Sequence, residues 1–240
     1  VSSVAVGVIS IRINTSEVVD FINESLRTTQ SGVTNTLDDW ASSLEHSVVA
    51  LAEKEELVQA FEEDDIESIK ELSDAEEELL EADILFVTDR NGKILTGDNA
   101  GKTIYVSGII KNALSGISGS SFDSPSVFGY GIYYSAPVKS PSGILGAVVA
   151  GYDLTSSDFV DLISKSYGVE CTVFDETVRV STTLGSEYIG SNLNNEAISN
   201  LVLGGGKPYY GENEISGKSY ISIYFPLKDE LGNISGMVFV

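Results

Sequence analysis

One pattern of residues occurs twice in the chain, and it constrains the fold more than any other feature of the sequence. A helix end with glycine, a proline inside an apolar strand and two glycines of a following hairpin return in the same order after 89 residues. The matched positions are 114–116 with 203–205, Pro137 with Pro226, Gly143 with Gly232, and, after one inserted residue, Gly146 with Gly236. An ordered repeat of this kind predicts two copies of one structural unit.

Each copy combines short apolar runs with turn signals. Residues 84–89 (ILFVTD) predict a strand, and the Asn-Gly pair that follows at 90–93 is typical of a hairpin turn. Residues 132–138 and 144–154 predict a second hairpin. Residues 156–168 begin with serines and end on a glycine, which predicts a helix that connects the two copies. The expected fold class is therefore α+β, with antiparallel sheets.

A long helix is expected before the first copy. Residues 17–61 contain no proline and one glycine, Gly32. Apolar side chains recur at steps of three or four, at Leu37, Trp40, Ala41, Leu44, Val48 and Leu51. This spacing forms one stripe of an α-helix. We predict one long helix over about residues 17–65, packed along both copies.

The charge of the chain excludes several classes of function. Its 14 Lys and Arg against 36 Asp and Glu give a formal net charge of −22. Such a surface lacks the clustered cations that nucleic acid or an anionic membrane surface requires. Half of the acids lie in residues 38–83, where they predict a solvated helical face, and no EF-hand loop supports a calcium site there.

Residues that usually carry catalysis are scarce. The single cysteine, Cys171, and the single histidine, His46, exclude a disulfide framework and His-pair zinc sites. Residues 116–120 only approach the G-x-S-x-G pattern of hydrolases, because the final glycine is missing. We predict no catalytic residues, no metal site and no cofactor, and a binding module in place of an enzyme.

The ordered segments resemble a known sensor family. A helix end of the form AL-x-G, a strand that ends in APV, and GAVVAGYDLTSSDFVDLI resemble a Cache domain, as does the second copy from GVECTVFD to GMVFV. With the preceding helix, they resemble the double Cache (dCache) extracytoplasmic sensor domain of bacterial methyl-accepting chemotaxis receptors.

The resemblance implies a division of the chain. It includes residues 1–13, whose small and apolar start is by itself typical of the outer end of a transmembrane segment, with an ordinary buried strand or helix start as the alternative. It further implies a long signalling and dimerisation helix at 14–75, a membrane-distal PAS-like (Cache) unit at 76–155, a linker helix at 156–168 and a membrane-proximal unit at 169–240.

The expected function follows from the same resemblance. The chain would be the ligand-binding sensor of a transmembrane chemoreceptor, facing the extracytoplasmic side of the cell membrane. It would form a homodimer through the long helix, bind a small molecule and bind no nucleic acid. The alternatives are the sensor of a histidine kinase or of a cyclic-dinucleotide enzyme, or a structural or adhesion module.

The expected ligand site lies in the distal unit. Its candidate residues are Tyr105, Ser107, Tyr130, Tyr133, Ser135 and Asp153. By this resemblance, family members that bind amino acids carry an Arg-x-Trp-Tyr cluster in the stretch that corresponds to residues 104–116. This chain has no Arg and no Trp there, so we expect a short carboxylate in place of an amino acid. Asp153 matches the residue that binds an ammonium group in that class, although it could instead cap the next helix. If Asp153 lines the pocket, an amine or cation becomes the better prediction.

A second candidate site lies in the proximal unit. Arg179 precedes a run of hydroxyl side chains, and Tyr220 and Tyr224 share one strand face. Arginine beside hydroxyl groups suits a carboxylate. The alternative is a surface arginine that pairs with nearby acids. In the distal unit, the same alternation places Tyr133 and Ser135 on one face of a strand and Tyr134 on the other.

Overall fold

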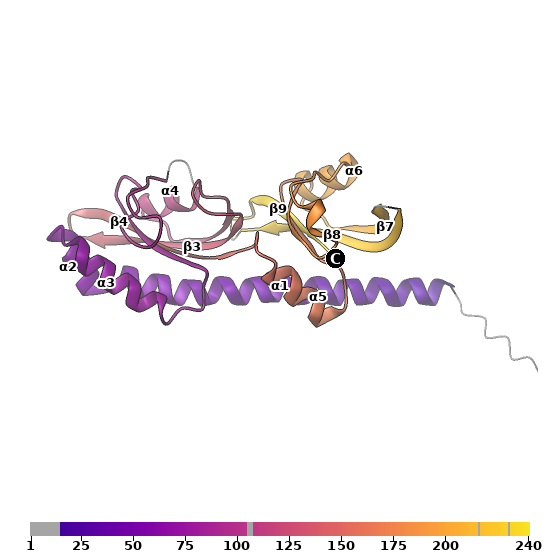
Figure 1. Cartoon of the computed structure of the whole chain (residues 1–240), viewed down its shortest axis with the longest axis horizontal. Coiled ribbons are helices and arrows are strands. Elements are labelled where there is room, and N and C mark those ends of the chain that lie inside the picture. The colour runs from indigo at the N-terminus through magenta and orange to yellow at the C-terminus, as the bar shows by residue number, and fades with distance from the viewer. Residues whose placement is uncertain (1–14, 105–107, 216, 230) are drawn as a thin grey trace, which may run out of the picture.

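The computed structural model describes residues 15–104, 108–215, 217–229 and 231–240, with side chains from residue 20 onward. A long helix runs lengthwise beneath two antiparallel sheets, and short helices cover the opposite faces of the sheets (Figure 1). The predicted α+β architecture, a long N-terminal helix followed by two similar units, is confirmed. The segment predicted as a transmembrane end, 1–13, lies outside the described residues.

The long helix α1 (Thr15–Ala52) has 38 residues and one buried stripe. The buried side chains recur at helical spacing and are Leu26, Val33, Leu37, Leu44, Val48 and Leu51. The first three of these pack in a cluster with the second sheet, and the last three pack with the first sheet. The helix therefore contacts both units, as its apolar pattern predicts.

The predicted single helix over 17–65 is wrong at its C-terminal end. α1 ends at Ala52, and two separate helices, α2 (Glu55–Glu62) and α3 (Ile66–Glu77), follow it where one helix up to residue 75 is predicted. The second break contains Asp64, whose φ of 55° is left-handed, and Asp65, whose carboxylate accepts the backbone N–H of Ser68 at 3.2 Å and starts α3.

The reason for the breaks is burial. Leu57 of α2 and Ile69 of α3 are buried in the same cluster as Leu51 of α1. A straight continuation of α1 would carry these apolar side chains away from the sheet and into solvent. Helical periodicity alone does not report where the sheet ends.

The first unit is a four-stranded sheet in the order β1-β4-β3-β2. Its strands are β1 (Ile84–Asp89), β2 (Gly119–Asp123), β3 (Gly131–Ser140) and β4 (Gly143–Asp153), and α4 (Gly108–Leu114) covers the face away from α1. The hydroxyl of Tyr134 donates to Glu45 of α1 at 3.2 Å, whereas Ser135 Oγ donates to the carbonyl of Ile109 in α4 at 2.9 Å. The predicted alternation along this strand is confirmed.

The second unit is a five-stranded sheet in the order β6-β5-β9-β8-β7. Its elements are β5 (Thr172–Asp175), β6 (Val178–Thr182), η1 (Ser186–Tyr188), α6 (Glu196–Ser199), the π-helix η2 (Asn200–Gly204), β7 (Tyr209–Ile215), β8 (Lys218–Lys228) and β9 (Ile234–Phe239). The connecting helix α5 (Asp158–Tyr167) ends at Gly168, whose φ is 68°, as its terminal glycine predicts.

The two sheets repeat each other in register. Gly146 of β4 pairs with Asp89 at the end of β1, and Gly236 of β9 pairs with Asp175 at the end of β5. A Cβ added at Gly146 would collide with the carbonyl oxygen of Thr88, and one added at Gly236 would collide with the carbonyl oxygen of Phe174. The repeated glycine thus marks a place where two strands approach too closely for any side chain.

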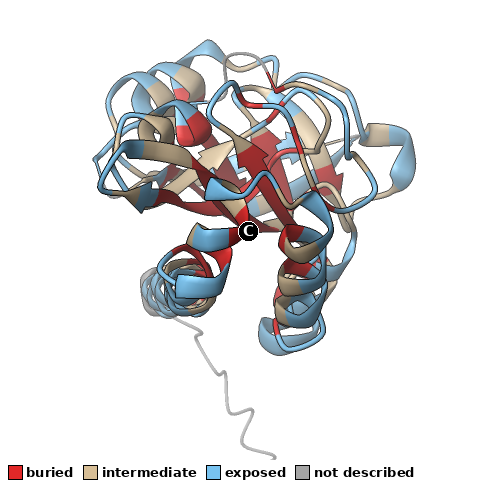
Figure 2. Cartoon of the chain, turned by 90° about the vertical axis from the view of Figure 1, so that its left-hand side faces the viewer, coloured by how far each residue is buried: buried red, intermediate tan, exposed pale blue. Residues whose placement is uncertain are grey.

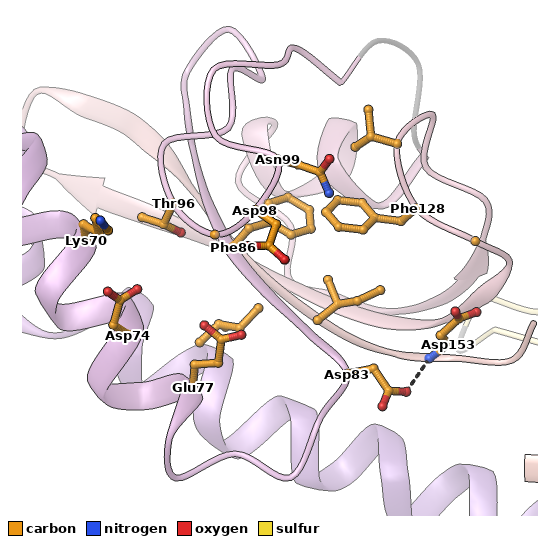
Figure 3. A pocket seen from close by; sticks show the side chains of 15 residues that line it. Lys70, Asp74, Glu77, Asp83, Phe86, Thr96, Asp98, Asn99, Phe128 and Asp153 are labelled. Atoms are coloured by element: carbon orange, nitrogen blue, oxygen red, sulfur yellow. Dashed lines mark hydrogen bonds between the residues drawn. The ribbon is translucent and has the colours of Figure 1, made fainter. Parts of the chain in front are cut away.

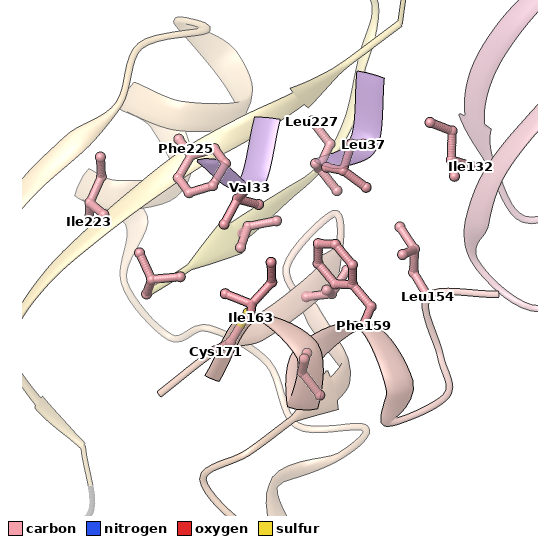
Figure 4. Packing of buried hydrophobic residues seen from close by; sticks show 14 of the residues in the cluster. Val33, Leu37, Ile132, Leu154, Phe159, Ile163, Cys171, Ile223, Phe225 and Leu227 are labelled. Carbon is pink, nitrogen blue, oxygen red and sulfur yellow. The ribbon is translucent and has the colours of Figure 1, made fainter. Parts of the chain in front are cut away.

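The buried strands lie between the helices on one side and the loops and short helices on the other (Figure 2). Where the units meet, Val33 and Leu37 of α1 lie near Phe225 and Leu227 of β8, with Ile132 of the first sheet beside them (Figure 4). One hydrophobic cluster therefore joins the long helix, α5 and both sheets.

The repeated glycines give a direct test of this register. Gly146→Ala and Gly236→Ala should each lower the free energy of unfolding by about 2–3 kcal/mol, because the added Cβ forces the strands apart. Urea denaturation measures the change. Gly204→Ala is the matched control, since its Cβ would meet nothing within 4 Å. Equal stability of all three variants would contradict the register.

Candidate functional site

A pocket of about 620 Å³ lies beside β1, the edge strand of the first unit (Figure 3). Its walls come from α3, β1, residues 96–99, residues 127–129 and the end of β4. The lining side chains named in Figure 3 are Lys70, Asp74, Glu77, Asp83, Phe86, Thr96, Asp98, Asn99, Phe128 and Asp153. Segments far apart in the sequence therefore build this site.

Two stacked aromatic rings form the apolar wall. The ring of Phe128 lies 4.8 Å from that of Phe86 at an interplanar angle of 13°. Phe86 is held by β1, and the backbone N–H of Phe128 donates to the carbonyl of Pro125 at 2.8 Å, which closes a turn. An apolar wall with a few polar groups is typical of ligand pockets.

The polar part of the pocket is strongly acidic. Asp74, Glu77, Asp83, Asp98 and Asp153 contribute carboxylates, and Lys70 is the one cation among the lining residues. The backbone N–H of Asp153 donates to Asp83 Oδ2 at 2.8 Å, which holds these two acids next to each other. A field of this sign attracts cations and repels anions.

Asp153 does not cap the next helix. The N-cap of α5 is Ser157, and Asp153 Oδ1 instead accepts the backbone N–H of Thr155 at 2.8 Å and its hydroxyl at 2.6 Å. This is an Asx turn that fixes the carboxylate at the rim of the pocket. Of the two roles considered for Asp153, the structure supports a position in the pocket.

The other distal candidates lie elsewhere. Tyr133 is fully buried, its hydroxyl donates to the carbonyl of Gly129 at 2.7 Å, and burial raises its pKa well above the usual range. Ser135 is also buried and bonds to α4. Neither residue lines the pocket, although Gly129 does. Tyr105 and Ser107 lie outside the described residues.

Tyr130 occupies the junction between the two units. Its buried hydroxyl lies 3.0 Å from Ser235 Oγ of β9, and Ser235 Oγ donates to the carbonyl of Phe122 at 3.0 Å. Ser124 Oγ donates to Asp175 Oδ2 of β5 at 2.9 Å. Residues 122–130 thus bond to the second unit, while 127–129 line the pocket of the first.

The proximal candidates share one face of the second sheet. Tyr224 is buried against Phe174 and Phe239, and burial raises its pKa to about 12. Tyr220 packs edge-on against Phe239, at 6.4 Å between ring centroids. Arg179 lies over the ring of Phe174, with its Cζ 5.1 Å from the ring centroid. The predicted common face of Tyr220 and Tyr224 is confirmed.

Thr96 is a site residue that the sequence did not indicate. Its buried hydroxyl accepts the backbone N–H of Val87 in β1 at 3.0 Å and lies 3.0 Å from Ser73 Oγ of α3. It therefore fastens two walls of the pocket together. The acids of α3 were also missed, because they lie in the segment that was interpreted as a solvated helical face.

Two kinds of feature do not occur in the described residues. Across those ranges, no helix combines the length and apolar character that crossing a membrane requires. In the same ranges, no group of three or more His, Cys, Asp or Glu side chains is arranged to hold a metal ion.

Comparison with known proteins identifies the fold. Residues 152–240 match the family described as single Cache domain 3, which covers α5 and the second unit. No curated protein matches the chain. The sensor domain of the V. cholerae histidine kinase DctB is similar over 93% of this chain and 96% of that chain, with a TM-score of 0.63 and 16% identity.

Two further solved structures extend the likeness. The ligand-binding domain of the Campylobacter jejuni chemoreceptor Tlp3, in complex with L-valine, matches 94% of this chain and 92% of that chain at a TM-score of 0.58 and 14% identity. The periplasmic domain of Vibrio cholerae LuxQ matches 89% of this chain and 97% of that chain, at a TM-score of 0.54 and 15% identity. The chain has the fold of Cache sensor domains, and the predicted resemblance to them is confirmed.

The role of Thr96 can be tested without a ligand. Thr96→Val keeps the shape of the side chain but leaves the Val87 N–H and the Ser73 hydroxyl without this partner. Unsatisfied buried groups of this kind cost about 2 kcal/mol, which urea denaturation should detect. Thr28→Val, at an exposed position of α1, is the control and should change stability by less than about 0.5 kcal/mol. An equal change in stability in both variants would show that Thr96 does not hold α3 and β1, two walls of the pocket, together.

Proposed function

We propose that this chain is the extracytoplasmic ligand-sensing domain of a membrane receptor, and that the pocket of its first unit binds a small organic cation. The observation that carries the proposal is the acidic pocket with an aromatic wall, set in a Cache sensor fold. Cache domains are ligand-binding sensor modules and not catalytic ones, which agrees with the scarcity of catalytic residues. The sensor domain of the histidine kinase DctB and the ligand-binding domain of the chemoreceptor Tlp3 supply the precedent for a sensing role.

The charge of the pocket favours an amine over the short carboxylate that the sequence suggested. The lining residues include five carboxylates and one ammonium group, that of Lys70. An anion would have to approach Asp83 and Asp153 against like charge, whereas an ammonium group would donate charge-assisted hydrogen bonds to both carboxylates. The apolar part of such a ligand would lie against Phe128, whose ring also attracts cations.

The acids come from separate segments, which favours an extended ligand. One acidic group consists of Asp74 and Glu77 of α3 with Asp98 of the loop after β1. The other consists of Asp83 and Asp153, at the opposite end of the pocket (Figure 3). A chain with amino groups at both ends could contact both acidic groups at once. Linear diamines are therefore included among the candidate ligands.

Signal transmission would use two contacts that start at the pocket. Tyr152, next to Asp153, stacks on Trp40 of α1 at 4.4 Å between ring centroids. Gly129, which lines the pocket, is followed by Tyr130, whose hydroxyl contacts Ser235 of β9. A ligand that fits one arrangement of these residues better would shift the population toward it. α1 and the second unit would then carry the change toward the membrane.

An amine panel tests the proposal. We expect 1,4-diaminobutane, ethanolamine or choline to raise the melting temperature of the chain, because a ligand that binds the folded state stabilises it. Acetate and succinate at equal ionic strength should not act at this pocket. Calorimetric affinity for the best amine should fall at least tenfold in Asp153→Asn and Asp83→Asn, both of which keep the oxygen that their backbone partner needs.

The matched control is Glu212→Gln, which removes the same charge from an exposed position on β7. It should bind the amine as the wild type does. Equal weakening in all three variants would point to the overall charge and contradict a site at Asp83 and Asp153. If no amine, carboxylate or amino acid stabilises the chain, the structural or adhesion module becomes the better assignment.

A further inference from the structure

The corresponding parts of the two sheets are covered by different segments of the chain. In the second unit, the ring of Tyr130 packs against Gly236, so a residue of the first unit covers this part of β9. In the first unit, the ring of Phe61 in α2 packs against the equivalent glycine, Gly146 of β4. Where α2 provides the cover in this way, a cavity remains beside the aromatic ring.

This cavity has a volume of about 330 Å³ and shares no lining residue with the acidic pocket. Its apolar part comes from Phe61, Ile69 of α3, Leu95 and Leu145. Ile66 also lines it and is 49% exposed, so a ligand there would remove apolar surface from water. A cavity of this size with an apolar floor suits a small organic molecule.

Two cations, Arg90 and Lys93, line the cavity from the hairpin turn after β1. The turn holds them in place, because Asp89 Oδ1 accepts the backbone N–H of Asn91 at 2.8 Å and that of Lys93 at 2.9 Å. The backbone N–H of Asp89 also donates to the carbonyl of Lys93 at 2.9 Å. The lining of the acidic pocket includes one cation, whereas the lining of this cavity includes two.

The opposite charge comes from Asp64, in the connection between α2 and α3. Its φ of 55° is left-handed, a conformation that Gly, Asn and Asp tolerate better than other residues. Within the described ranges, the Asp64 carboxylate and the side-chain nitrogens of Arg90 and Lys93 have no hydrogen bond or ion pair. Charges of both signs can therefore contact a ligand in one cavity.

From these observations we propose a second binding site at this cavity, for a small zwitterion whose ammonium and carboxylate groups are separated by a short aliphatic chain. The carboxylate contacts Arg90 and Lys93, and the ammonium group contacts Asp64. The aliphatic chain lies against Phe61 and Leu95. A ligand with a single charge meets like charge from one of the two elements. The ω-amino acids have the required chemistry, and the site is independent of the proposed amine pocket.

Thermal shift and calorimetry with 4-aminobutanoate and 5-aminopentanoate test this site, with sodium chloride at the same ionic strength as the reference. Wild type should bind at least one of the two saturably. Butylamine and pentanoate, which each carry one of the two charges, should bind here at least tenfold more weakly. Arg90→Gln and Lys93→Gln should each weaken binding of the zwitterion several-fold. Asp64→Asn, which tolerates the left-handed backbone, should weaken it at least tenfold.

The controls separate this site from overall charge and from the amine pocket. Glu212→Gln and Lys218→Gln remove one charge of each sign from exposed positions of the second unit and should bind the zwitterion as wild type does. Asp153→Asn should also bind it unchanged. Binding lost in Asp153→Asn but kept in Asp64→Asn would place the zwitterion in the amine pocket and overturn the proposal. So would equally tight binding of valine at this cavity, or no binding of either ω-amino acid.

Discussion

The burial of one stripe of α1 against both sheets is the interaction on which the rest of the structure depends. The short helices alone do not cover both faces of either sheet, because in both units the face toward α1 carries large apolar side chains. Trp40 marks the middle of this contact, stacked on Tyr152 of the first unit and edge-on to Phe159 of α5 at 5.5 Å. The helix therefore fixes where each unit lies along a common axis.

This arrangement places the acidic pocket close to the helix. Asp153 at the pocket rim follows Tyr152, so a residue that would contact ligand adjoins one that contacts α1. The second connection passes through Tyr130, whose ring packs directly against Gly236. A Cβ at position 236 would collide with this ring. Residues 127–130 and 152–153 therefore join the pocket to α1 and to the second unit, which is the connection that the proposed sensing function requires.

Charge differs sharply between the two units. Within a net charge of −22, the acids of α3 and Asp153 gather around the pocket of the first unit, whereas the second unit places the half-buried Arg179 over the ring of Phe174.

The sequence predicted the repeat, the hairpins and the helix stripe because each depends on neighbours along the chain. It failed at the end of α1, where burial of Leu57 and Ile69 breaks the helix. It also failed at Tyr130, since nothing local reveals that this aromatic side chain meets β9 and not a ligand. The pocket itself was hidden because its walls come from α3, two loops and the end of β4, which only the folded chain brings together.

The fluorescence of Trp40, the one tryptophan of the chain, tests the central claim most directly. The protein is titrated with whichever amine gives the largest thermal shift, and the emission is compared with binding measured by calorimetry. If occupancy of the acidic pocket moves the junction, the emission will change saturably with the calorimetric dissociation constant, and the change will be lost in Asp153→Asn. Binding of the amine with unchanged Trp40 emission would contradict the account.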